Sequence, residues 1–442
     1  MATRTSVGSG LWSSVGTWDT GVPVDGDDVV IASGHTVTFD VNQSAFVTGV
    51  KVTVTGTLTH TTAAGSYCLF LKTGASVVGA GTWNIGTSGA PLPFASKHTI
   101  TGAAGWYVDG VAGLTMTVYG AEPTYTSIKL SADEAIGQTE LSVDTNVTGD
   151  IWAAGDIVRI DDINKAQESE ERVIAAGGIA AGTITVTAGL TAAKSAGAVV
   201  SLITRNIKII AVGTGTYTIY RVGTGSVTKL TVASGMWYGV NKTMFDSCHY
   251  AAISGGTFSK NNSTLNACNY VSISGGTFSG NSNAIYNCAA ASISGGAFSG
   301  NNYGLTGCTA ASISGGTFSG NSSGLTGCTA ASISGGTFSG NSNAIYNCAA
   351  ASISGGAFSG NNYGLNSCAA ASISGGAFSG NNSGLTGCTS AAISGGTFSG
   401  NTYDIRQTTG NLFGITLTSA IEHYMYSSVS DWWNSLQSDN HD

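Results

Sequence analysis

Eight cysteines recur at a fixed spacing of 20 residues, and regularly spaced thiols could form disulfides or bind a metal. If successive 20-residue units stack as coils about 4.8 Å apart, the thiols fall into one column. A single column offers a metal one ligand per turn rather than a tetrahedral set. Parallel side chains are also poorly oriented for a disulfide. We therefore expect buried free thiols that behave as small apolar side chains. The series is Cys248, Cys268, Cys288, Cys308, Cys328, Cys348, Cys368 and Cys388.

Carboxylates, which would be needed to cleave glycosidic bonds, are missing from this repeated half of the chain. Between Asp246 and Asp404 there is no Asp or Glu, and Lys260 is the only fully charged residue. Glycoside hydrolysis requires two positioned carboxyl groups. We therefore expect no catalytic residue in the repeats, which we interpret as a spacer or a surface.

Acidic clusters occur elsewhere, and each has a structural and a functional interpretation. The turn Asp25-Gly26-Asp27-Asp28 could coordinate calcium, although an acidic turn that precedes a strand is the interpretation we favour. The clusters Asp161-Asp162 and Glu168-Ser169-Glu170-Glu171 are interpreted as a solvated face. A glycan lyase or hydrolase with a site in residues 1–210 stays open as an alternative, and Asp27 and Asp161 are the residues whose replacement would test it.

The histidines give no further sign of chemistry. His35, His60, His98 and His249 have no neighbours at the spacing of metal ligands or of a catalytic triad. The sequence contains no nucleophile elbow and no phosphate-binding loop. The prediction is therefore that the chain has no catalytic, cofactor-binding or metal-binding residues, and that it needs no cofactor.

The elements that hold these residues follow from the repeat itself. From about Phe245 to Ile405 the unit reads approximately A-S-I-S-G-G-(T/A)-F-S-G-N-x-x-x-(L/I)-x-x-C. A fixed period of this length is typical of a solenoid, in which each unit stacks on its neighbours. Ile and Phe alternate with outward Ser on two short strands, and a third segment brings Leu or Ile and Cys inward. The turn asparagines, Asn261 through Asn401, are predicted to form a hydrogen-bonded stack.

The repeats are themselves duplicated. Residues 271–330 match residues 331–390 almost letter for letter, which suggests that the length of the solenoid matters more than any single coil. One outward column would have to be threonine throughout to form a flat ice-binding face, and alanines interrupt it, so ice binding is disfavoured. That column is Thr277, Ala297, Thr317, Thr337, Ala357, Ala377 and Thr397.

Composition divides the chain into four predicted regions. Residues 1–124 show short Thr- and Val-rich strands of an irregular β-helical domain. Residues 125–205 contain eleven of the 24 acidic residues and are predicted to form a small inserted antiparallel β-domain. Residues 206–414 form the regular parallel β-helix. Residues 415–442 are predicted to form a C-terminal helical cap, because Ser419-Ala420-Ile421-Glu422 has the spacing of a capping box.

Overall composition limits the classes of partner that the chain can bind. The net charge of −8 and only 16 basic residues argue against a nucleic-acid partner. No apolar run reaches the length of a membrane-spanning helix, and the N-terminus lacks the apolar core of a signal peptide. A chain with nine cysteines and no disulfide framework fits synthesis in a reducing cytosol.

The N-terminal region resembles a known family. Gly10-Leu11-Trp12, Gly16-Thr17-Trp18, the run Val22–Ile31 and Gly34-His35-Thr36-Val37-Thr38 resemble the eight-glycine domain of fibrocystin-like and hyaluronan-depolymerising cell-surface proteins. Further on, Ala154–Ile160, Glu170–Ile174 and Leu202–Ile209 resemble that family's inserted module and returning strand. The resemblance covers about the first 210 residues and implies a right-handed parallel β-helix on an extracellular or particle surface. The repeats resemble parallel β-helix fibres, including phage tail spikes and adhesins.

The sequence therefore predicts an all-β chain: a right-handed parallel β-helix of about 20 residues per coil, with a small inserted β-domain and a C-terminal α-helical cap. The favoured function is a non-enzymatic structural or adhesive appendage, such as a phage fibre, spike or decoration protein assembled in the cytosol and located on the virion. A secreted bacterial surface adhesin or filament subunit is the first alternative. Expected partners are other copies of the chain, virion or surface structural proteins, and host surface glycans.

Overall fold

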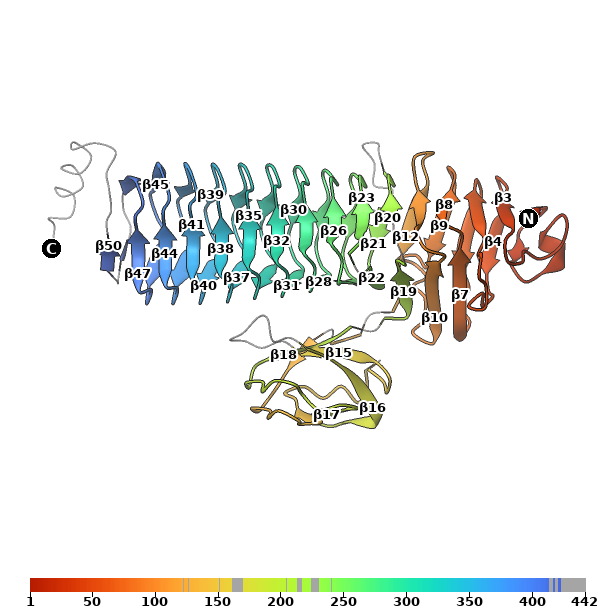
Figure 1. Cartoon of the computed structure of the whole chain (residues 1–442), viewed down its shortest axis with the longest axis horizontal. Coiled ribbons are helices and arrows are strands. Elements are labelled where there is room, and N and C mark those ends of the chain that lie inside the picture. Colours follow the sequence, from red (N-terminus) through yellow and green to blue (C-terminus); the bar gives the residue numbers. More distant parts are fainter. Residues whose placement is uncertain are drawn as a thin grey trace. The chain divides into compact units, whose positions relative to one another are not determined.

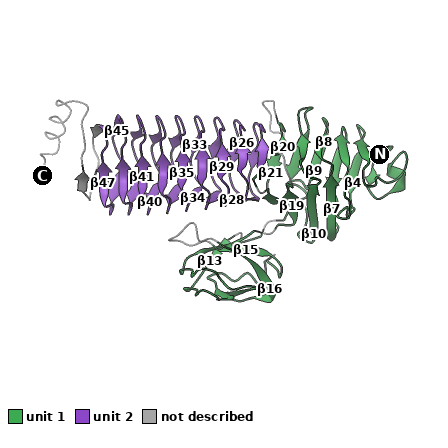
Figure 2. Cartoon of the chain, in the orientation of Figure 1, with its two compact units in different colours: residues 1–224, 229–242 green, residues 225–228, 243–442 purple. Residues whose placement is uncertain are grey.

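The structure is a computed structural model, and its described residues fall into two compact units. They comprise residues 1–442 except 122, 126, 151, 161–169, 204, 213–216, 224–229, 240, 413–415, 418–419 and 423–442. The N-terminal unit contains residues 1–224 and 229–242, and the C-terminal unit contains residues 225–228 and 243–442 (Figure 2).

Parallel coils form most of the N-terminal unit, and each complete coil contributes one strand to each of three sheets. The strands of successive coils lie side by side in Figure 1. Sheet 1 contains β1 (Thr3–Thr5), β3 (Asp28–Ile31), β5 (Lys51–Val54), β8 (Gly74–Val78), β11 (Trp106–Asp109) and β20 (Tyr217–Tyr220). Sheet 2 contains β2 (Gly10–Leu11), β4 (Thr36–Phe39), β6 (Thr57–His60), β9 (Thr82–Ile85), β12 (Thr115–Val118) and β21 (Leu230–Val232). Sheet 3 contains β7 (Gly65–Leu71), β10 (Ser96–Gly102), β19 (Ile207–Ile210) and β22 (Met236–Tyr238).

Alternation along the strands explains why these segments form the walls of a filled helix. In β4 the side chains of Val37 and Phe39 are fully buried, whereas Thr36 is exposed and Thr38 is half-buried. Successive side chains of a strand point to opposite faces, so the apolar set lies inside. The parallel pairing places like on like, for example Val37 beside Leu58 of the next coil.

An antiparallel sheet lies between β12 and β19 in the sequence. Its strand order is β13-β18-β15-β16-β17-β14, and it surrounds a hydrophobic cluster of its own that includes Leu141, Trp152 and Val158. These residues and the N-terminal coils belong to one compact unit. The separate inserted domain therefore stays a prediction. The strands are β13 (Ser127–Lys129), β14 (Glu140–Ser142), β15 (Ile157–Ile160), β16 (Glu170–Ala180), β17 (Thr183–Val186) and β18 (Val199–Leu202).

The C-terminal unit contains the regular coils, again with three parallel sheets. Sheet 4 contains β23 (Thr243–Asp246), β26 (Ser263–Asn266), β29 (Asn283–Tyr286), β32 (Tyr303–Thr306), β35 (Ser323–Thr326), β38 (Asn343–Tyr346), β41 (Tyr363–Asn366), β44 (Ser383–Thr386), β47 (Tyr403–Arg406) and β50 (Ala420–Glu422). Sheet 5 contains β24 (Ala252–Ile253), β27 (Ser272–Ile273), β30 (Ser292–Ile293), β33 (Ser312–Ile313), β36 (Ser332–Ile333), β39 (Ser352–Ile353), β42 (Ser372–Ile373), β45 (Ala391–Ile393) and β48 (Gly410–Leu412). Sheet 6 contains β25 (Thr257–Ser259), β28 (Thr277–Ser279), β31 (Ala297–Ser299), β34 (Thr317–Ser319), β37 (Thr337–Ser339), β40 (Ala357–Ser359), β43 (Ala377–Ser379), β46 (Thr397–Ser399) and β49 (Thr416–Leu417).

Side-chain ladders fill the interior of the regular coils, as the 20-residue period predicts. Eight phenylalanines from Phe258 to Phe398 stack with ring centroids 4.6 to 5.0 Å apart and nearly parallel planes. Ile273 pairs with Ile293, and Leu265 pairs with Ile285. A stacked aromatic pair contributes about 0.5–1.5 kcal/mol beyond the burial of its area. Every coil therefore receives the same stabilising contacts from the coils before and after it.

The Gly-Gly pair in each coil is required by the close approach of neighbouring coils. A Cβ atom on Gly315 would lie 2.2 Å from the carbonyl oxygen of Ser294 in the preceding coil. Gly316 adopts a φ of 85°, in the left-handed region that favours glycine. The prediction that Gly275-Gly276 permits the bend of its coil is confirmed, and the same geometry recurs in each later coil.

The predicted C-terminal helix is not supported. Ala420–Glu422, which should begin it, forms strand β50 and pairs with β47, so the coil register outweighs the capping-box pattern there. Residues 423–442, which carry the rest of the predicted cap, lie outside the described residues. Among the described residues the only helical segment is the 3-10 turn η1 (Val15–Thr17).

Candidate functional site

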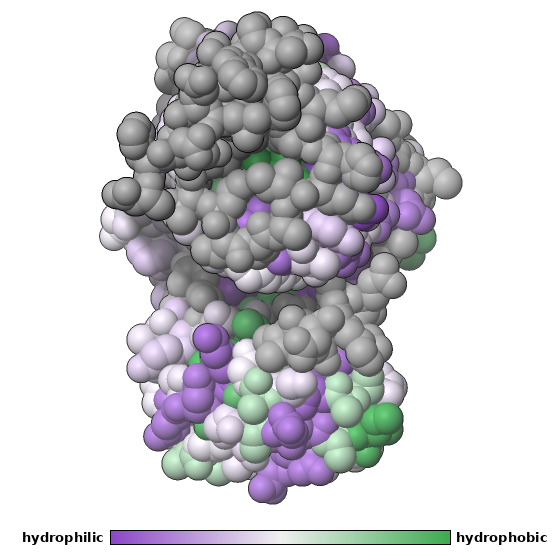
Figure 3. Space-filling model, turned by 90° about the vertical axis from the view of Figure 1, so that its left-hand side faces the viewer, coloured by the Kyte–Doolittle hydropathy of each residue, from purple (hydrophilic) through white to green (hydrophobic). Residues whose placement is uncertain are grey.

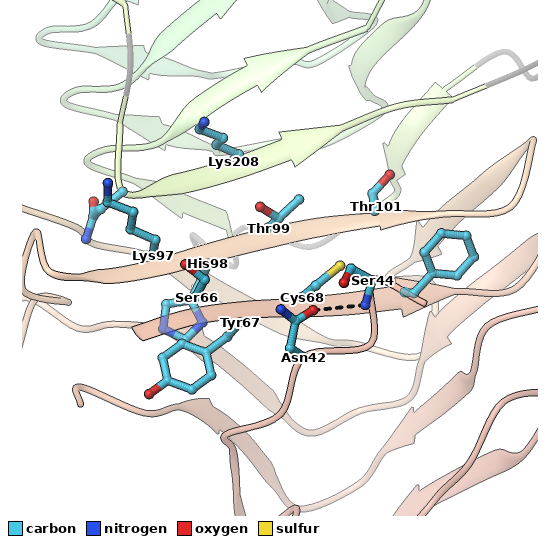
Figure 4. A pocket seen from close by; sticks show the side chains of 12 residues that line it. Asn42, Ser44, Ser66, Tyr67, Cys68, Lys97, His98, Thr99, Thr101 and Lys208 are labelled. Atoms are coloured by element: carbon cyan, nitrogen blue, oxygen red, sulfur yellow. Dashed lines mark hydrogen bonds between the residues drawn. The ribbon is translucent and has the colours of Figure 1, made fainter. Parts of the chain in front are cut away.

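A groove of about 370 Å³ on the outer side of sheet 3 is the candidate functional site of the N-terminal unit (Figure 4). Strands β7, β10 and β19 form its floor, and the segment that contains Asn42 and Ser44 forms one wall. Asn42 Oδ1 accepts a hydrogen bond of 3.0 Å from the backbone N–H of Ser44, which fixes that wall. The lining residues are Asn42, Ser44, Ser66, Tyr67, Cys68, Phe70, Lys97, His98, Thr99, Thr101, Asn206 and Lys208.

Two lysines give the groove its charge. Thr99 of β10 pairs with Lys208 of β19, which places Lys97 diagonally across from Lys208. Lys97 is exposed and its Nζ lies 5.8 Å from the ring centroid of Phe94, whereas Lys208 is half-buried. No Asp or Glu lines the groove. Asp156 interacts electrostatically with both lysines, but burial raises the pKa of its carboxyl group above its usual value despite their charges.

Two histidines meet beneath this groove, although neither has a neighbour at metal-ligand or triad spacing in the sequence. His60 Nδ1 lies 3.0 Å from His98 Nδ1. Trp83 Nε1 donates a 3.1 Å hydrogen bond to His60 Nε2, and the ring of Tyr67 stacks on His98. Sequence reasoning missed the pair because the two residues are 38 positions apart, and only the coil register brings β6 and β10 together.

The hydrogen bonds fix the tautomers of both histidines. An indole N–H can only donate, so His60 accepts at Nε2 and must carry its proton on Nδ1. That proton is donated to His98 Nδ1, and His98 must therefore carry its own proton on Nε2. His98 Nε2 lies 2.8 Å from Ser96 Oγ and 3.0 Å from the carbonyl oxygen of Thr61.

This arrangement resembles a Ser-His-His catalytic set but cannot act as one. A general base must offer a lone pair to the serine hydroxyl, and His98 presents an N–H there instead. Ser96 is also fully buried, and its hydroxyl donates to the Thr61 carbonyl at 2.9 Å. Burial lowers the pKa of His98 to about 4 and the pKa of His60 well below its usual value, so both are neutral at pH 7. We conclude that the pair is a structural network under the groove.

The acidic turn at residues 25–28 uses its carboxylates within the fold. Asp25 accepts hydrogen bonds from the backbone N–H groups of Val47, Thr48 and Gly49, at 2.6–3.3 Å. Against the opposing effect of burial, these donors lower the pKa of Asp25. Asp27 binds Arg4 Nε at 2.9 Å and also the N–H of Ala2. Asp28 pairs with Lys72. The turn therefore holds the first coils together through these hydrogen bonds and ion pairs, in agreement with its interpretation as an acidic turn that precedes a strand.

The acidic cluster in the antiparallel sheet is only partly described. Asp161, Asp162 and Glu168 lie outside the described residues. Glu170 was predicted to lie on a solvated face, and this prediction is wrong because its side chain is 8% exposed. It pairs with Arg172 and, at 3.3 Å, with Lys194, whose side chain is completely buried. The ammonium group of Lys194 draws the carboxylate inward.

The cysteine column is confirmed as a row of free thiols. All nine cysteines are buried and free. Each thiol of the 20-residue series donates to a carbonyl oxygen of its own coil, as Cys308 Sγ does to Thr306 at 3.6 Å. The neighbouring thiol of Cys328, together with burial, raises the pKa of Cys308 far above its usual value. Within the described residues no group of three or more His, Cys, Asp or Glu side chains could hold a metal ion.

The turn asparagines are also confirmed as a stack. Asn361 accepts hydrogen bonds from the N–H and Nδ2 of Asn341, and it donates to Asn381 Oδ1 and to the Phe338 carbonyl oxygen. The same pattern runs from Asn261 to Asn401, where Nδ2 of the last amide donates to buried Asp404 at 2.8 Å.

The residues drawn in colour on the face shown in Figure 3 form no large apolar region. On the face drawn in Figure 3, the coloured residues are mostly hydrophilic or neutral, and hydrophobic ones occur in small groups. None of the helical structure in the described residues is long and apolar enough to cross a membrane.

Comparisons with solved structures find chains of low similarity. The chain is 12% identical to the tailspike of Acinetobacter baumannii bacteriophage AP22, solved in complex with A. baumannii capsular saccharide, with 84% of this chain and 72% of that one covered and a TM-score of 0.23. It is 13% identical to the tailspike of Pseudomonas phage LKA1, with 91% and 72% covered and a TM-score of 0.22. The A-module of the Azotobacter vinelandii mannuronan C-5 epimerase AlgE6 is 10% identical, with 91% and 90% covered and a TM-score of 0.23. Scores this low carry no argument about function.

A family model gives the more specific result. No curated protein matches the sequence. Residues 17–131 match the G8 domain, a span that runs from the end of η1 to β13 and includes the acidic turn and both buried histidines. The resemblance of the N-terminal region to the eight-glycine domain is thereby confirmed for residues 17–131.

Proposed function

We propose that the chain is a non-enzymatic, elongated structural and adhesive appendage, with a phage virion as its setting. The observation that carries this proposal is the regular stack of coils between Asp246 and Asp404. There the same apolar, amide and thiol ladders repeat from coil to coil, and Lys260 is the only fully charged side chain.

Chemistry needs a unique arrangement of reactive groups, and the regular coils offer the opposite. Their inward side chains are mostly Ile, Phe, Leu, Ala and Cys, and the asparagines of the stack are buried beside them. Their outward side chains are mostly Ser, Thr, Asn and Tyr, which exchange no proton near pH 7. Identical coils can be added or removed without disturbing a site, because each one contacts only its neighbours. A stack of this kind suits a rigid spacer.

The N-terminal unit is the part in which recognition or attachment can be localised. Its coils are irregular, its surface contains most of the chain's charge, and it contains the groove on sheet 3. In this proposal the spacer holds that unit at a distance from the body that carries it.

The free thiols favour a virion over a secreted surface protein. Nine buried cysteines without a disulfide suit folding in a reducing cytosol, where phage particles are assembled. The N-terminal region matches the G8 domain, and its sequence resembles cell-surface proteins that carry this domain. A bacterial surface adhesin is therefore kept as the alternative.

Immunogold electron microscopy on particles and cells from the source would test this proposal. Antibodies against the regular coils should label projections on virions. Labelling confined to the bacterial envelope would favour the bacterial surface adhesin over the virion protein. Labelling confined to the cell interior would refute the proposal of an appendage. In parallel, the purified chain should release no new reducing ends or unsaturated products from acidic polysaccharides, with or without calcium. Turnover that is abolished by Asp27→Asn would instead establish the lyase or hydrolase alternative.

A further inference from the structure

We propose that the groove on sheet 3 binds a carboxylated sugar residue of an acidic polysaccharide, with Lys97 and Lys208 as the charge contacts. This inference deepens the proposed function, since it assigns the adhesive part of the appendage to one site. The groove has a volume of about 370 Å³, at the lower end of the range for ligand sites. It would therefore hold a short segment of a glycan chain.

The charge of the lining selects an anion. Both lysines are on outward positions of adjacent strands, and their diagonal placement lets both ammonium groups reach one carboxylate. The lining contains no acidic side chain. The net charge of the whole chain is −8, so the basic groove is a local exception, and a highly charged polyanion such as nucleic acid is disfavoured. Asp156 interacts with both lysines and reduces the local positive potential.

The remaining lining suits a pyranose ring rather than a bare anion. Thr99 and Thr101 follow Lys97 along β10, and with Ser66 and Ser44 they present hydroxyl groups that can donate or accept. Figure 4 shows Lys97, Thr99 and Thr101 along this strand, with Lys208 on the neighbouring strand.

An aromatic ring, that of Phe70, supplies the apolar part of such a site. Phe70 is half-buried and pairs with Thr101 across β7 and β10. Tyr67 pairs with His98, and its ring stacks on that buried histidine with a centroid distance of 4.8 Å, so the Tyr67 ring lies on the inner face of the sheet and not on the groove surface. Sugar rings have apolar faces of C–H groups that pack on aromatic side chains, while their edges form hydrogen bonds.

The same groove is poorly equipped to cleave its ligand. A carboxylate pair is absent from the lining, and the hydrogen-bond network leaves His98 without a lone pair that could act as a base. The proposal is therefore one of binding without turnover.

Binding of defined oligosaccharides to the full chain would test the site. The probes are trimers of galacturonate, glucuronate and neuraminate, measured by isothermal titration calorimetry and saturation-transfer NMR at low ionic strength. The matched controls are the methyl esters of the same trimers, in which the carboxylates are masked. At least one acid should bind at least tenfold more tightly than its ester, because a charge-assisted hydrogen bond is about twice as strong as a neutral one. Its affinity should fall as salt is added.

Variants then localise the binding. Lys97→Gln and Lys208→Gln should each weaken the acid about tenfold. Phe70→Ala should weaken it about fivefold through lost packing, and Asp156→Asn should strengthen it. Lys260→Gln in the C-terminal unit removes the same charge and should change nothing. Circular dichroism confirms that each variant is folded, and a variant that fails to fold is replaced by Lys→Met at the same position.

Four outcomes would overturn the proposal: no acid trimer binds, the ester binds as tightly as the acid, inorganic phosphate competes at equal concentration, or the double variant K97Q/K208Q keeps full affinity. These results concern the groove alone. The proposed appendage would still be supported if antibodies against the regular coils label virions. Failure of the site and failure of the proposed function are therefore distinguishable.

Discussion

Replacement of Asn361 by alanine should locally destabilise the regular coils, whereas replacement of its neighbour Asn362 should not. Asn361 is 3% exposed and its side-chain amide makes four hydrogen bonds, with Asn341 (two), Asn381 and Phe338. Asn362 has the same side chain one position later but is exposed. The pair separates the role of the buried amide stack from the effect of losing an asparagine.

The magnitude follows from the groups that the change leaves without partners. In Asn361→Ala the backbone N–H of Asn341, one Nδ2 proton of Asn341 and the carbonyl oxygen of Phe338 lose their partner. Each buried unsatisfied group costs about 1–3 kcal/mol. Some relaxation and water entry are expected, so we predict a loss of about 3–6 kcal/mol in the free energy of local opening. Asn362→Ala should stay within about 0.5 kcal/mol of the parent.

Native-state hydrogen exchange is the suitable assay, because it resolves the coils individually. Tryptophan fluorescence would miss the effect, since no tryptophan lies between Trp237 and Trp432. In Asn361→Ala the amides of the coils around residues 338–381 should exchange faster, while distant coils and the N-terminal unit should be unchanged. Equal exchange in the two variants would refute the reasoning, and so would a loss of protection throughout the chain.

Two further predictions concern the buried histidine pair and the thiols. Because burial lowers the pKa of His98 to about 4 in the folded state, from 6.5 in the unfolded chain, its contribution is fully present above pH 6.5 and lost as pH falls to 4. The loss is about 3 kcal/mol at 1.36 kcal/mol per pH unit. His98→Gln should flatten this window in denaturant titrations followed by the fluorescence of the N-terminal unit, and an unchanged slope would contradict the assignment. All nine thiols are buried, so the native chain should react with a disulfide reagent only as fast as it opens; rapid modification of the native chain would show that the column is accessible.

Much of the C-terminal unit could be predicted from the sequence, because a strict repeat leaves few choices. Once Phe278 and Ile273 are placed inward, the 20-residue period puts every later Phe and Ile on the same ladders, and the structure agrees. The glycine pair, the asparagine stack and the free thiols follow from the same register. The failure at Ala420–Glu422 has the opposite cause: a local helix signal of four residues competed with strand pairing that the coils had already established.

The groove and the histidine pair could not be predicted in the same way. Lys97 and Lys208 are 111 positions apart, with the antiparallel sheet between them in the sequence. Only the pairing of β10 with β19 makes them neighbours. His60 and His98 belong to different sheets and meet because both side chains point into the same irregular coil interior. In the irregular coils no fixed period indicates which residues will be adjacent. The strands can therefore be predicted from the sequence, but the site cannot.

The proposed function depends most on the regular coils being interchangeable spacers that contain no site. Deletion of residues 331–390 tests it directly, because Ala330 then joins Ala391 at the same position of the 20-residue period. Small-angle X-ray scattering should show a maximum dimension shorter by about 14 Å, three steps of 4.7 Å between stacked rings. Circular dichroism should still report a folded β protein, and binding of the acidic trimer should be unchanged. An unfolded chain, an unchanged length or a loss of trimer binding would contradict the account.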